Sequence, residues 1–136
     1  MDSTLRDQLT AAFDADRSGV VAAYVFGSVA RDESAAGSDI DIAVLWDRRP
    51  AATLSGERLT LEGALERRLG RPVDLIALNT APSDLVHRVL RDGVLVVDRD
   101  RARRIRFEVE KRNEFFDLEP VRRRYRGSSG SPAGAR

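Results

Sequence analysis

The sequence predicts one α/β (α+β) domain, with a small mixed β-sheet of about four strands flanked by helices. Two observations support this fold class. Apolar runs of four to seven residues, typical of buried strands, alternate along the chain with segments of helical periodicity. Glycine or proline stands at several of the boundaries between them. The length of 136 residues also suits a single domain of ordinary size.

The expected strands are four segments rich in valine, leucine, isoleucine and alanine. They cover residues 20–26, 40–46, 72–78 and 94–97. The first is apolar throughout, which indicates burial on both faces of the sheet. The second ends at Trp46, which we expect in the core or at the rim of the sheet. Residues 47–50 then form a loop.

Five helical segments complete the pattern, at residues 3–17, 30–34, 55–69, 82–92 and 99–119. Ser3 is the expected N-cap of the first helix, and Gly19 is expected to end it. Pro82 suits the opening of the fourth helix. Pro120 is expected to break or kink the last helix, which residues 121–126 then resume.

The domain is expected to span residues 1–126, with its C-terminal helix over about 99–126. Residues 127–136 are rich in Gly, Ser, Ala and Pro, and we expect this tail to be disordered. Charge divides the chain unevenly, because residues 1–98 carry a net charge of −5 and residues 99–126 carry +5. The basic segment suits contact with nucleic acid or an acidic protein, or else forms a solvated helix face with ion pairs.

The composition excludes several kinds of site. There is no cysteine, and therefore no disulfide framework, thiolate metal site or cysteine nucleophile. His87 is the single histidine, which excludes a multi-histidine zinc site, and we expect it to pack or to lie at the surface. The longest apolar run near the start has seven residues, too few to span a membrane. The start does not resemble a signal peptide, so we expect a cytoplasmic protein.

The most informative pattern is Gly27-Ser28, followed after ten residues by Asp39 and Asp41. Side chains alternate along a strand, so the two acids point the same way, about 6.5–7 Å apart along the backbone. Carboxylates so placed can hold hard divalent cations such as Mg²⁺. A glycine at a strand end lets backbone approach a ligand, and the next N–H groups with the Ser28 hydroxyl can cradle a phosphate. A phosphate cradle beside a metal site indicates phosphoryl or nucleotidyl transfer.

A third acid, Asp74, lies inside the apolar run 72–78. A carboxylate there is costly unless it is paired, hydrogen-bonded or bound to a metal. Each acid also has a structural explanation by itself, with Asp39 in a turn, Asp41 on a solvated strand face and Asp74 at a sheet edge. Their joint occurrence favours the functional interpretation.

Three segments together resemble the minimal nucleotidyltransferases of the DNA polymerase beta superfamily. They are residues 27–31 (GSVAR), 38–44 (SDIDIAV) and 71–75 (RPVDL). The resemblance covers about residues 20–98, and the C-terminal helix is loosely similar. It implies the nucleotidyltransferase fold and membership of the small antitoxins that are paired with HEPN-domain toxins.

The resemblance also implies a role for each matching residue. Gly27 and Ser28 would hold the triphosphate of a nucleotide, and Asp39 and Asp41 would bind two Mg²⁺ ions. Asp74 would complete the metal nearer the acceptor and help to draw a proton from the acceptor hydroxyl. Two cations about 3.5–4 Å apart can stabilise both the attacking and the leaving oxygen of an in-line displacement.

Arg31 follows the Gly-Ser turn, where a guanidinium fork suits a phosphate. A surface ion pair is the equal alternative for this side chain.

The activity that the resemblance implies is transfer of AMP from ATP to a tyrosine of a cognate HEPN ribonuclease toxin, which silences the toxin. Nucleic acid is not expected to be the direct substrate. One alternative is an antitoxin that neutralises its toxin by binding alone. Another is a small-molecule, antibiotic-type nucleotidyltransferase, which the length disfavours because little chain is left for an acceptor-binding domain.

The C-terminal helix is the expected surface for that partner. Ile105, Val109, Arg112 and Phe116 lie near one of its faces, with Phe115 beside them. Adjacent helical residues point about 100° apart, so one phenylalanine can be exposed as an anchor while the other packs. Packing of both on the sheet is the alternative.

Overall fold

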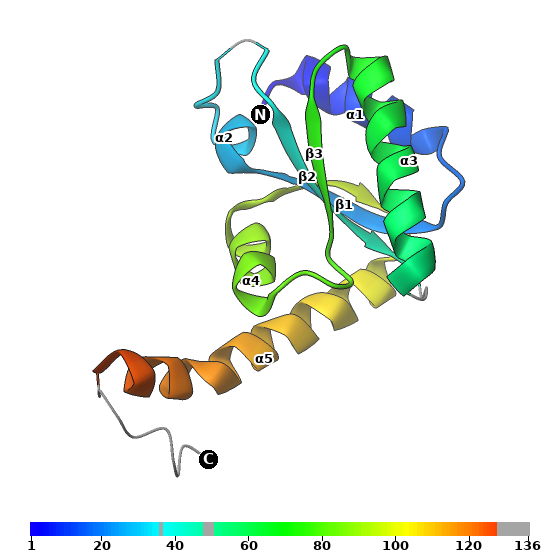
Figure 1. Ribbon diagram of the computed structural model, residues 1–136. Helices are drawn as coiled ribbons and strands as arrows, with labels where there is room; N and C mark the ends of the chain where they lie inside the picture. Colours follow the sequence, from blue (N-terminus) through cyan, green and yellow to red (C-terminus); the bar gives the residue numbers. More distant parts are fainter. Residues whose placement is uncertain (36, 48–50, 128–136) are drawn as a thin grey trace.

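The computed structural model describes residues 1–35, 37–47 and 51–127 of the chain. Five helices and four strands follow one another through these residues (Figure 1). They are α1 (Ser3–Asp14), β1 (Val20–Phe26), α2 (Gly27–Ala30), β2 (Ile40–Trp46), α3 (Ala51–Leu69), β3 (Val73–Ala77), α4 (Ser83–Asp92), β4 (Val94–Asp98) and α5 (Arg101–Gly127). Residues 48–50 of the expected loop and 128–136 of the expected tail lie outside the described residues.

The four strands form one mixed sheet in the order β3-β2-β1-β4. β1 runs antiparallel to both β2 and β4, while β3 runs parallel to β2. β1 is thus an inner strand, and its residues are buried as far as Val25, as the continuous apolar run predicts. The predicted fold class, a small mixed sheet flanked by helices, is confirmed.

Helices cover both faces of this sheet (Figure 1). α1 and α3 pack on one face, where Leu9, Phe13 and Leu65 belong to the larger buried cluster. α4 and α5 pack on the other face, where Val89 and Phe107 belong to a second cluster. Each strand therefore sends alternate side chains into one of two apolar layers.

α1 begins and ends differently from the prediction. Asp2 rather than Ser3 is its N-cap, since the Asp2 carboxylate accepts a hydrogen bond from the Leu5 N–H at 3.3 Å. At the other end, Asp16 accepts hydrogen bonds from the N–H (3.1 Å) and the hydroxyl (2.7 Å) of Ser18. This local turn competes with helix, so the helix stops short of residue 17.

Two further boundaries differ from the prediction. α2 occupies residues 27–30 rather than 30–34, because Gly27, with φ +73°, turns the chain directly from β1 into the helix. Asp32, with φ +58°, lies outside helical backbone geometry soon afterwards. α3 begins at Ala51, ahead of the predicted start at residue 55.

α5 continues through Pro120 to Gly127, so no break interrupts the helix there. Proline removes the hydrogen bond to the carbonyl four residues earlier, at Phe116, but the helix continues on both sides of it. Figure 1 shows the C-terminal part of α5 extending beyond α4. None of the described helices, α5 included, is both long and apolar enough to cross a membrane.

A polar network holds α5 against the sheet. The Tyr24 hydroxyl donates to Glu108 Oε2 at 2.6 Å, and Arg104 pairs with the same carboxylate and with Asp98, both at 3.0 Å. Burial, and then the hydrogen bond to Glu108, raise the pKa of Tyr24 far above its usual range. Together with the buried Phe107, these contacts fix which side of α5 faces the sheet.

The apolar face noted in the sequence of α5 consequently points to solvent. Ile105, Val109 and Phe116 are 39%, 49% and 59% exposed. Phe115 instead stacks on His87 of α4, with ring centroids 3.7 Å apart and planes inclined by 2°. His87 is therefore a half-buried packing residue, as expected.

The free edge of β3 is closed by side chains of α3. Glu66 and Glu62 accept hydrogen bonds from the N–H groups of Val73 and Leu75, each at 2.9 Å. Arg58 donates to the Leu75 carbonyl at 3.2 Å. Because these backbone groups already have partners, this edge does not offer the open ladder needed for adding a further strand.

Candidate active site

Three carboxylates share one face of the sheet at one of its ends. Asp41 of β2 stands opposite Asp74 of β3 in parallel register, and opposite Phe26 of β1 on its other side. Neighbouring strands lie about 4.8 Å apart, so the two acids are close neighbours. Asp39 precedes Asp41 by two residues and points to the same side.

Strand directions explain why the acids gather at this end. The end of β1 meets the starts of β2 and β3, so the chain leaves β1 beside the first residues of both acid-bearing strands. Asp41 is half-buried, whereas Asp39 and Asp74 are exposed. Asp74 lies on β3, an edge strand, which agrees with the structural explanation of this acid as one at a sheet edge. On that strand Asp74 is also the residue in register with Asp41.

Gly27 closes this end of the sheet with a conformation and a spacing that suit only glycine. Its φ of +73° lies in the left-handed region. A Cβ at this position would overlap the Oδ2 atom of Asp41. The backbone turn between β1 and α2 therefore packs directly against the Asp41 carboxylate.

A hollow of about 370 Å³ opens beside this turn, and we call it the arginine hollow. It is lined by Phe26, Gly27, Ser28, Arg31, Asp41, Arg88 and Asp92. Within the described chain, the Ser28 hydroxyl has no hydrogen-bond partner and remains available to a ligand. The hollow joins two carboxylates, Asp41 and the Arg91-paired Asp92, to two guanidinium groups, a combination suited to a metal-bound polyphosphate.

The two arginines of this hollow differ in their partners. Arg31 forms an ion pair with Glu33 at 2.8 Å and is half exposed, so the alternative of a surface ion pair describes its state here. Arg88 has no ion pair or hydrogen bond with any described residue. Sequence reasoning missed Arg88, which comes from α4. Its neighbour Arg91 pairs with Asp92 at 2.8 Å, and this hydrogen bond lowers the pKa of Asp92.

A second hollow, of about 460 Å³, lies at the sheet edge on the side of Asp74, and we call it the edge hollow. It is lined by Leu54, Ser55, Arg58, Asp74, Leu75, Ile76, Ala77, Thr80, Ala81, Pro82 and Leu85. The arginine hollow and the edge hollow have no lining residue in common. The paired acids Asp41 and Asp74 each border one of them.

Negative charge accumulates between the two hollows. Burial raises the pKa of the Asp41 carboxyl, the charges of Asp74 and then Asp39 raise it further, and Arg31 opposes them. A bound cation would relieve this repulsion.

The described residues hold no ready cage for a metal, since no three His, Cys, Asp or Glu side chains among them are gathered closely enough. Mg²⁺ does not need one, because it usually binds through one or two carboxylates, waters and the phosphates of its substrate. Asp41, which lines the arginine hollow, and Asp39, whose charge acts on Asp41, are hard oxygen donors that fit that kind of site.

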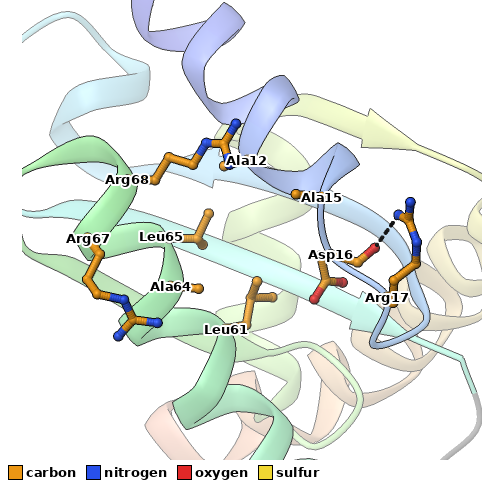
Figure 2. A pocket seen from close by; sticks show the side chains of 9 residues that line it. All are labelled: Ala12, Ala15, Asp16, Arg17, Leu61, Ala64, Leu65, Arg67 and Arg68. Carbon is orange, nitrogen blue, oxygen red and sulfur yellow. Dashed lines mark hydrogen bonds between the residues drawn. The ribbon is translucent and has the colours of Figure 1, made fainter.

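A third hollow, the helical groove, lies in the opposite layer between α1 and α3. It has about 480 Å³ and is lined by Ala12, Ala15, Asp16, Arg17, Leu61, Ala64, Leu65, Arg67 and Arg68 (Figure 2). Figure 2 shows its arginines around an apolar floor. None of the three carboxylates borders it, so it is separate from the candidate site.

Comparison with known families decides what this arrangement belongs to. Residues 8–102 match the family model described as polymerase beta, nucleotidyltransferase. The chain belongs to this nucleotidyltransferase family. The match contains the glycine turn and all three acids, so the residues gathered at the sheet end lie inside the region that defines the family.

A relative of known name supports the same assignment. The nucleotidyltransferase is 37% identical over 81 residues to the protein adenylyltransferase MntA of Thermococcus cleftensis, covering 60% of this chain and 79% of that protein.

Solved structures agree in fold. A chain in a crystal structure of a toxin–antitoxin pair with AMP-PNP has a TM-score of 0.71 and 24% identity, covering 87% of this chain and 92% of that one. A chain in the complex of a tri-AMPylated Shewanella oneidensis HEPN toxin with its MNT antitoxin has a TM-score of 0.68 and 23% identity, covering 90% and 93%. At this identity the two likenesses establish the nucleotidyltransferase fold.

Proposed function

We propose that this nucleotidyltransferase is an antitoxin that transfers AMP from ATP to a tyrosine of a cognate HEPN ribonuclease toxin, and that it requires Mg²⁺. The observation that carries the proposal is the register pairing of Asp41 with Asp74, with Asp39 on the same face and the Gly27 turn beside them. The relative named as a protein adenylyltransferase supports the choice of a protein acceptor.

The nucleotide occupies the arginine hollow. The backbone at Gly27 comes close to the triphosphate, the Ser28 hydroxyl donates to a phosphate oxygen, and Arg88 neutralises part of the charge. Arg31 can contribute when it leaves its ion pair with Glu33. Positioning and charge neutralisation are what phosphoryl and nucleotidyl transfer chiefly require from a protein.

Asp39 and Asp41 would hold two Mg²⁺ ions, and Asp74 would contribute to the one nearer the acceptor. When bound, the ions offset the negative charge of the triphosphate and of the in-line transition state. The acceptor's phenolic oxygen forms a bond to the α-phosphorus, the bond from that phosphorus to the bridging oxygen breaks, and pyrophosphate leaves. Asp74 accepts the phenolic proton.

Transfer of label from α-labelled ATP to the HEPN partner tests the proposal. We expect a labelled tyrosine with the wild type plus Mg²⁺ and none with EDTA. Asp39→Asn and Asp41→Asn should each lower the rate by about 10²-fold or more. Asp14→Asn, an exposed acid at the end of α1, is the control that should keep the wild-type rate.

Each alternative predicts a different result. A toxin that is neutralised without any label points to inhibition by binding alone. Label that appears only on small molecules points to an antibiotic-type enzyme. Undiminished labelling by both Asn variants means that the site is assigned wrongly.

A further inference from the structure

Asp39 lies just outside the hydrogen-bonded part of the sheet. β2 begins at Ile40, and its pairing with β1 ends at Asp41, which stands opposite Phe26. The backbone at Asp39 is therefore not held by β1. Exposed segments with few backbone partners open at low free energy, so a carboxylate placed here needs some other contact to fix its direction.

Both peptide groups that flank Asp39 are bound by one short segment, which precedes β3. On one side, the Ser38 carbonyl accepts hydrogen bonds from Nη2 (2.7 Å) and Nε (3.3 Å) of Arg71. On the other side, the Ile40 N–H donates to the Pro72 carbonyl at 3.0 Å. Because peptide groups are planar, holding the two groups on either side of a residue fixes its φ and ψ. These angles set the direction in which the Asp39 side chain leaves the backbone.

The two contacts depend on the sequence in different ways. The bond from Ile40 to Pro72 joins two backbone groups, so it needs no particular side chain. The bonds to Ser38 need a side chain with two donors in a fixed fork, which a guanidinium provides and an ammonium does not. Arg71 is thus the side chain on which the geometry before Asp39 depends.

Arg71 is not part of the nucleotide site itself. It does not line the arginine hollow, and it forms no ion pair with any carboxylate that the structure describes. It borders a separate hollow of about 180 Å³, whose other lining residues are Asp2, Leu5, Val29, Asp32 and Ser34. Its guanidinium is engaged with a backbone carbonyl, so its effect on a ligand passes through the chain at Asp39.

We propose that Arg71 is a positioning residue for Asp39, which orients this carboxylate by holding the Ser38 carbonyl before any metal ion binds. The segment that contains Arg71 continues into β3, so the same bonds fix Asp39 relative to Asp74. The inference rests on the proposed function, in which Asp39 is a ligand of Mg²⁺. Replacing a residue that orients a metal ligand typically lowers metal affinity by about 10- to 100-fold.

The first test needs neither metal nor nucleotide. Arg71→Met keeps an unbranched apolar stem and removes every donor. In NMR relaxation of the backbone amides in EDTA, the order parameter at Asp39 should be about 0.85 in the wild type and should fall below about 0.6 in the variant. Val44, in the middle of β2, should stay rigid in both proteins. A mobile Asp39 in the wild type, or a rigid one in the variant, overturns the inference.

The second test separates positioning from a general loss of stability. The affinity for AMP-PNP is measured with Mg²⁺ and again in EDTA, and the ratio of the two gives the gain due to the metal. Arg71→Met should lower this gain by about tenfold or more and leave the affinity in EDTA unchanged. An equal loss of affinity in EDTA would mean that Arg71 acts through its charge or on the whole fold, and it overturns the inference.

Arg99→Met is the matched control. Arg99 also donates to a backbone carbonyl, that of Phe13, and it lies at the other end of the sheet, where its N–H binds the Val21 carbonyl at the start of β1. Its gain from the metal should equal that of the wild type. Arg71→Gln is the second variant, neutral and without the two-donor fork, and it decides both tests if Arg71→Met does not fold.

The outcomes separate this inference from the proposed function. A wild type that gains no affinity from Mg²⁺ overturns the metal site of the proposed function, and this inference with it. A wild type that gains affinity, together with an Arg71→Met variant that gains as much, overturns the positioning role and leaves the proposed function intact. A mobile Asp39 with a reduced gain from the metal, in a variant that binds AMP-PNP normally in EDTA, supports both.

Discussion

The backbone of Gly27 packs against the carboxylate of Asp41 so closely that a methyl group at residue 27 would overlap Asp41 Oδ2. One structural unit therefore contains the turn after β1 and the side chain of Asp41, the β2 acid that lines the arginine hollow. Its geometry depends on a left-handed φ of +73° as well as on the missing side chain.

Gly27→Ala should destabilise the protein more than Gly70→Ala does. Both glycines have a positive φ, +73° and +67°, so each alanine pays a backbone penalty of about 1–2 kcal/mol. Open space surrounds Gly70, whereas Gly27 meets Asp41. Chemical denaturation gives the two free energies of unfolding. Equal losses would show that the carboxylate moves aside at no cost.

Asp41→Asn should stabilise the metal-free protein at neutral pH. Burial and the charges of Asp74 and Asp39 raise the pKa of Asp41 in the folded state above its unfolded value. The folded state is then favoured while Asp41 is protonated, and that advantage is lost as the pH rises through the folded pKa. The asparagine variant has no ionisable group at position 41 and does not lose this stability. Its free energy of unfolding should therefore equal that of the wild type in acid and exceed it increasingly towards neutral pH.

Urea unfolding in EDTA between pH 3.5 and 7 measures this difference. Adding Mg²⁺ with AMP-PNP should reverse the order of stability, because ligand binding stabilises the wild type and the Asn variant binds it weakly. An Asn variant that is less stable than the wild type at pH 7 in EDTA contradicts the electrostatic account.

Arg88→Ala should weaken the binding of AMP-PNP by about tenfold or more, since it removes a charged donor from the arginine hollow. Arg91→Ala is the matched control on the same helix, because Arg91 is engaged with Asp92 and does not line the hollow. Calorimetric titration measures both affinities, and melting temperatures check the fold. Equal affinities in the two variants would remove Arg88 from the nucleotide site.

Local pattern was enough to place the glycine turn and the acid pair. The strand period sets the relation of Asp39 to Asp41, and β1 and β2 have the predicted bounds because their apolar runs are continuous. Local pattern cannot predict that Asp74 lies beside Asp41, because this follows from the parallel register of two strands that are separated in the sequence by the whole of α3. The sequence could indicate that Asp74 needs a partner, but not which residue stands opposite.

Other features depend on how elements dock. Arg88 reaches the arginine hollow because α4 packs beside the end of β1, and a single exposed arginine on a helix carries no signal of that position. α5 has apolar residues on two sides, and the contact of Tyr24 with Glu108 helps to decide which side meets the sheet. The helical periodicity of the sequence therefore predicted that α5 is a helix, but which side of α5 faces the sheet is known only from the tertiary structure.

That orientation sharpens the hypothesis that α5 contacts the partner. Ile105, Val109 and Phe116 form an exposed apolar stripe at helical spacing. Arg101 and Arg106 have no ion pair within the described chain and flank the stripe, whereas Arg104 is tied to Asp98 and Glu108. An apolar centre with a basic rim is suited to an apolar patch bordered by acidic residues.

Phe116→Ala should lower partner affinity and lower the melting temperature less than Phe115→Ala does, because Phe116 is 59% exposed and meets His87 and Phe115 only edge-on. Truncating an anchor of this kind costs about 2 kcal/mol or more of binding free energy. Phe115→Ala should lower the melting temperature, since it removes the ring that stacks on His87 at 3.7 Å. Leu59→Ala is the matched control, an equally exposed apolar residue on α3, at 58%.

Affinity for the HEPN partner and thermal unfolding, measured on all three variants, separate an interface from a packing role. Neutralising Arg101 and Arg106 should slow association and weaken its dependence on salt, with little effect on dissociation. If Phe116→Ala and the doubly neutralised variant bind as tightly and as fast as the wild type, α5 is not the contact surface. An equal loss of affinity in Leu59→Ala would instead place the partner on both layers of the domain.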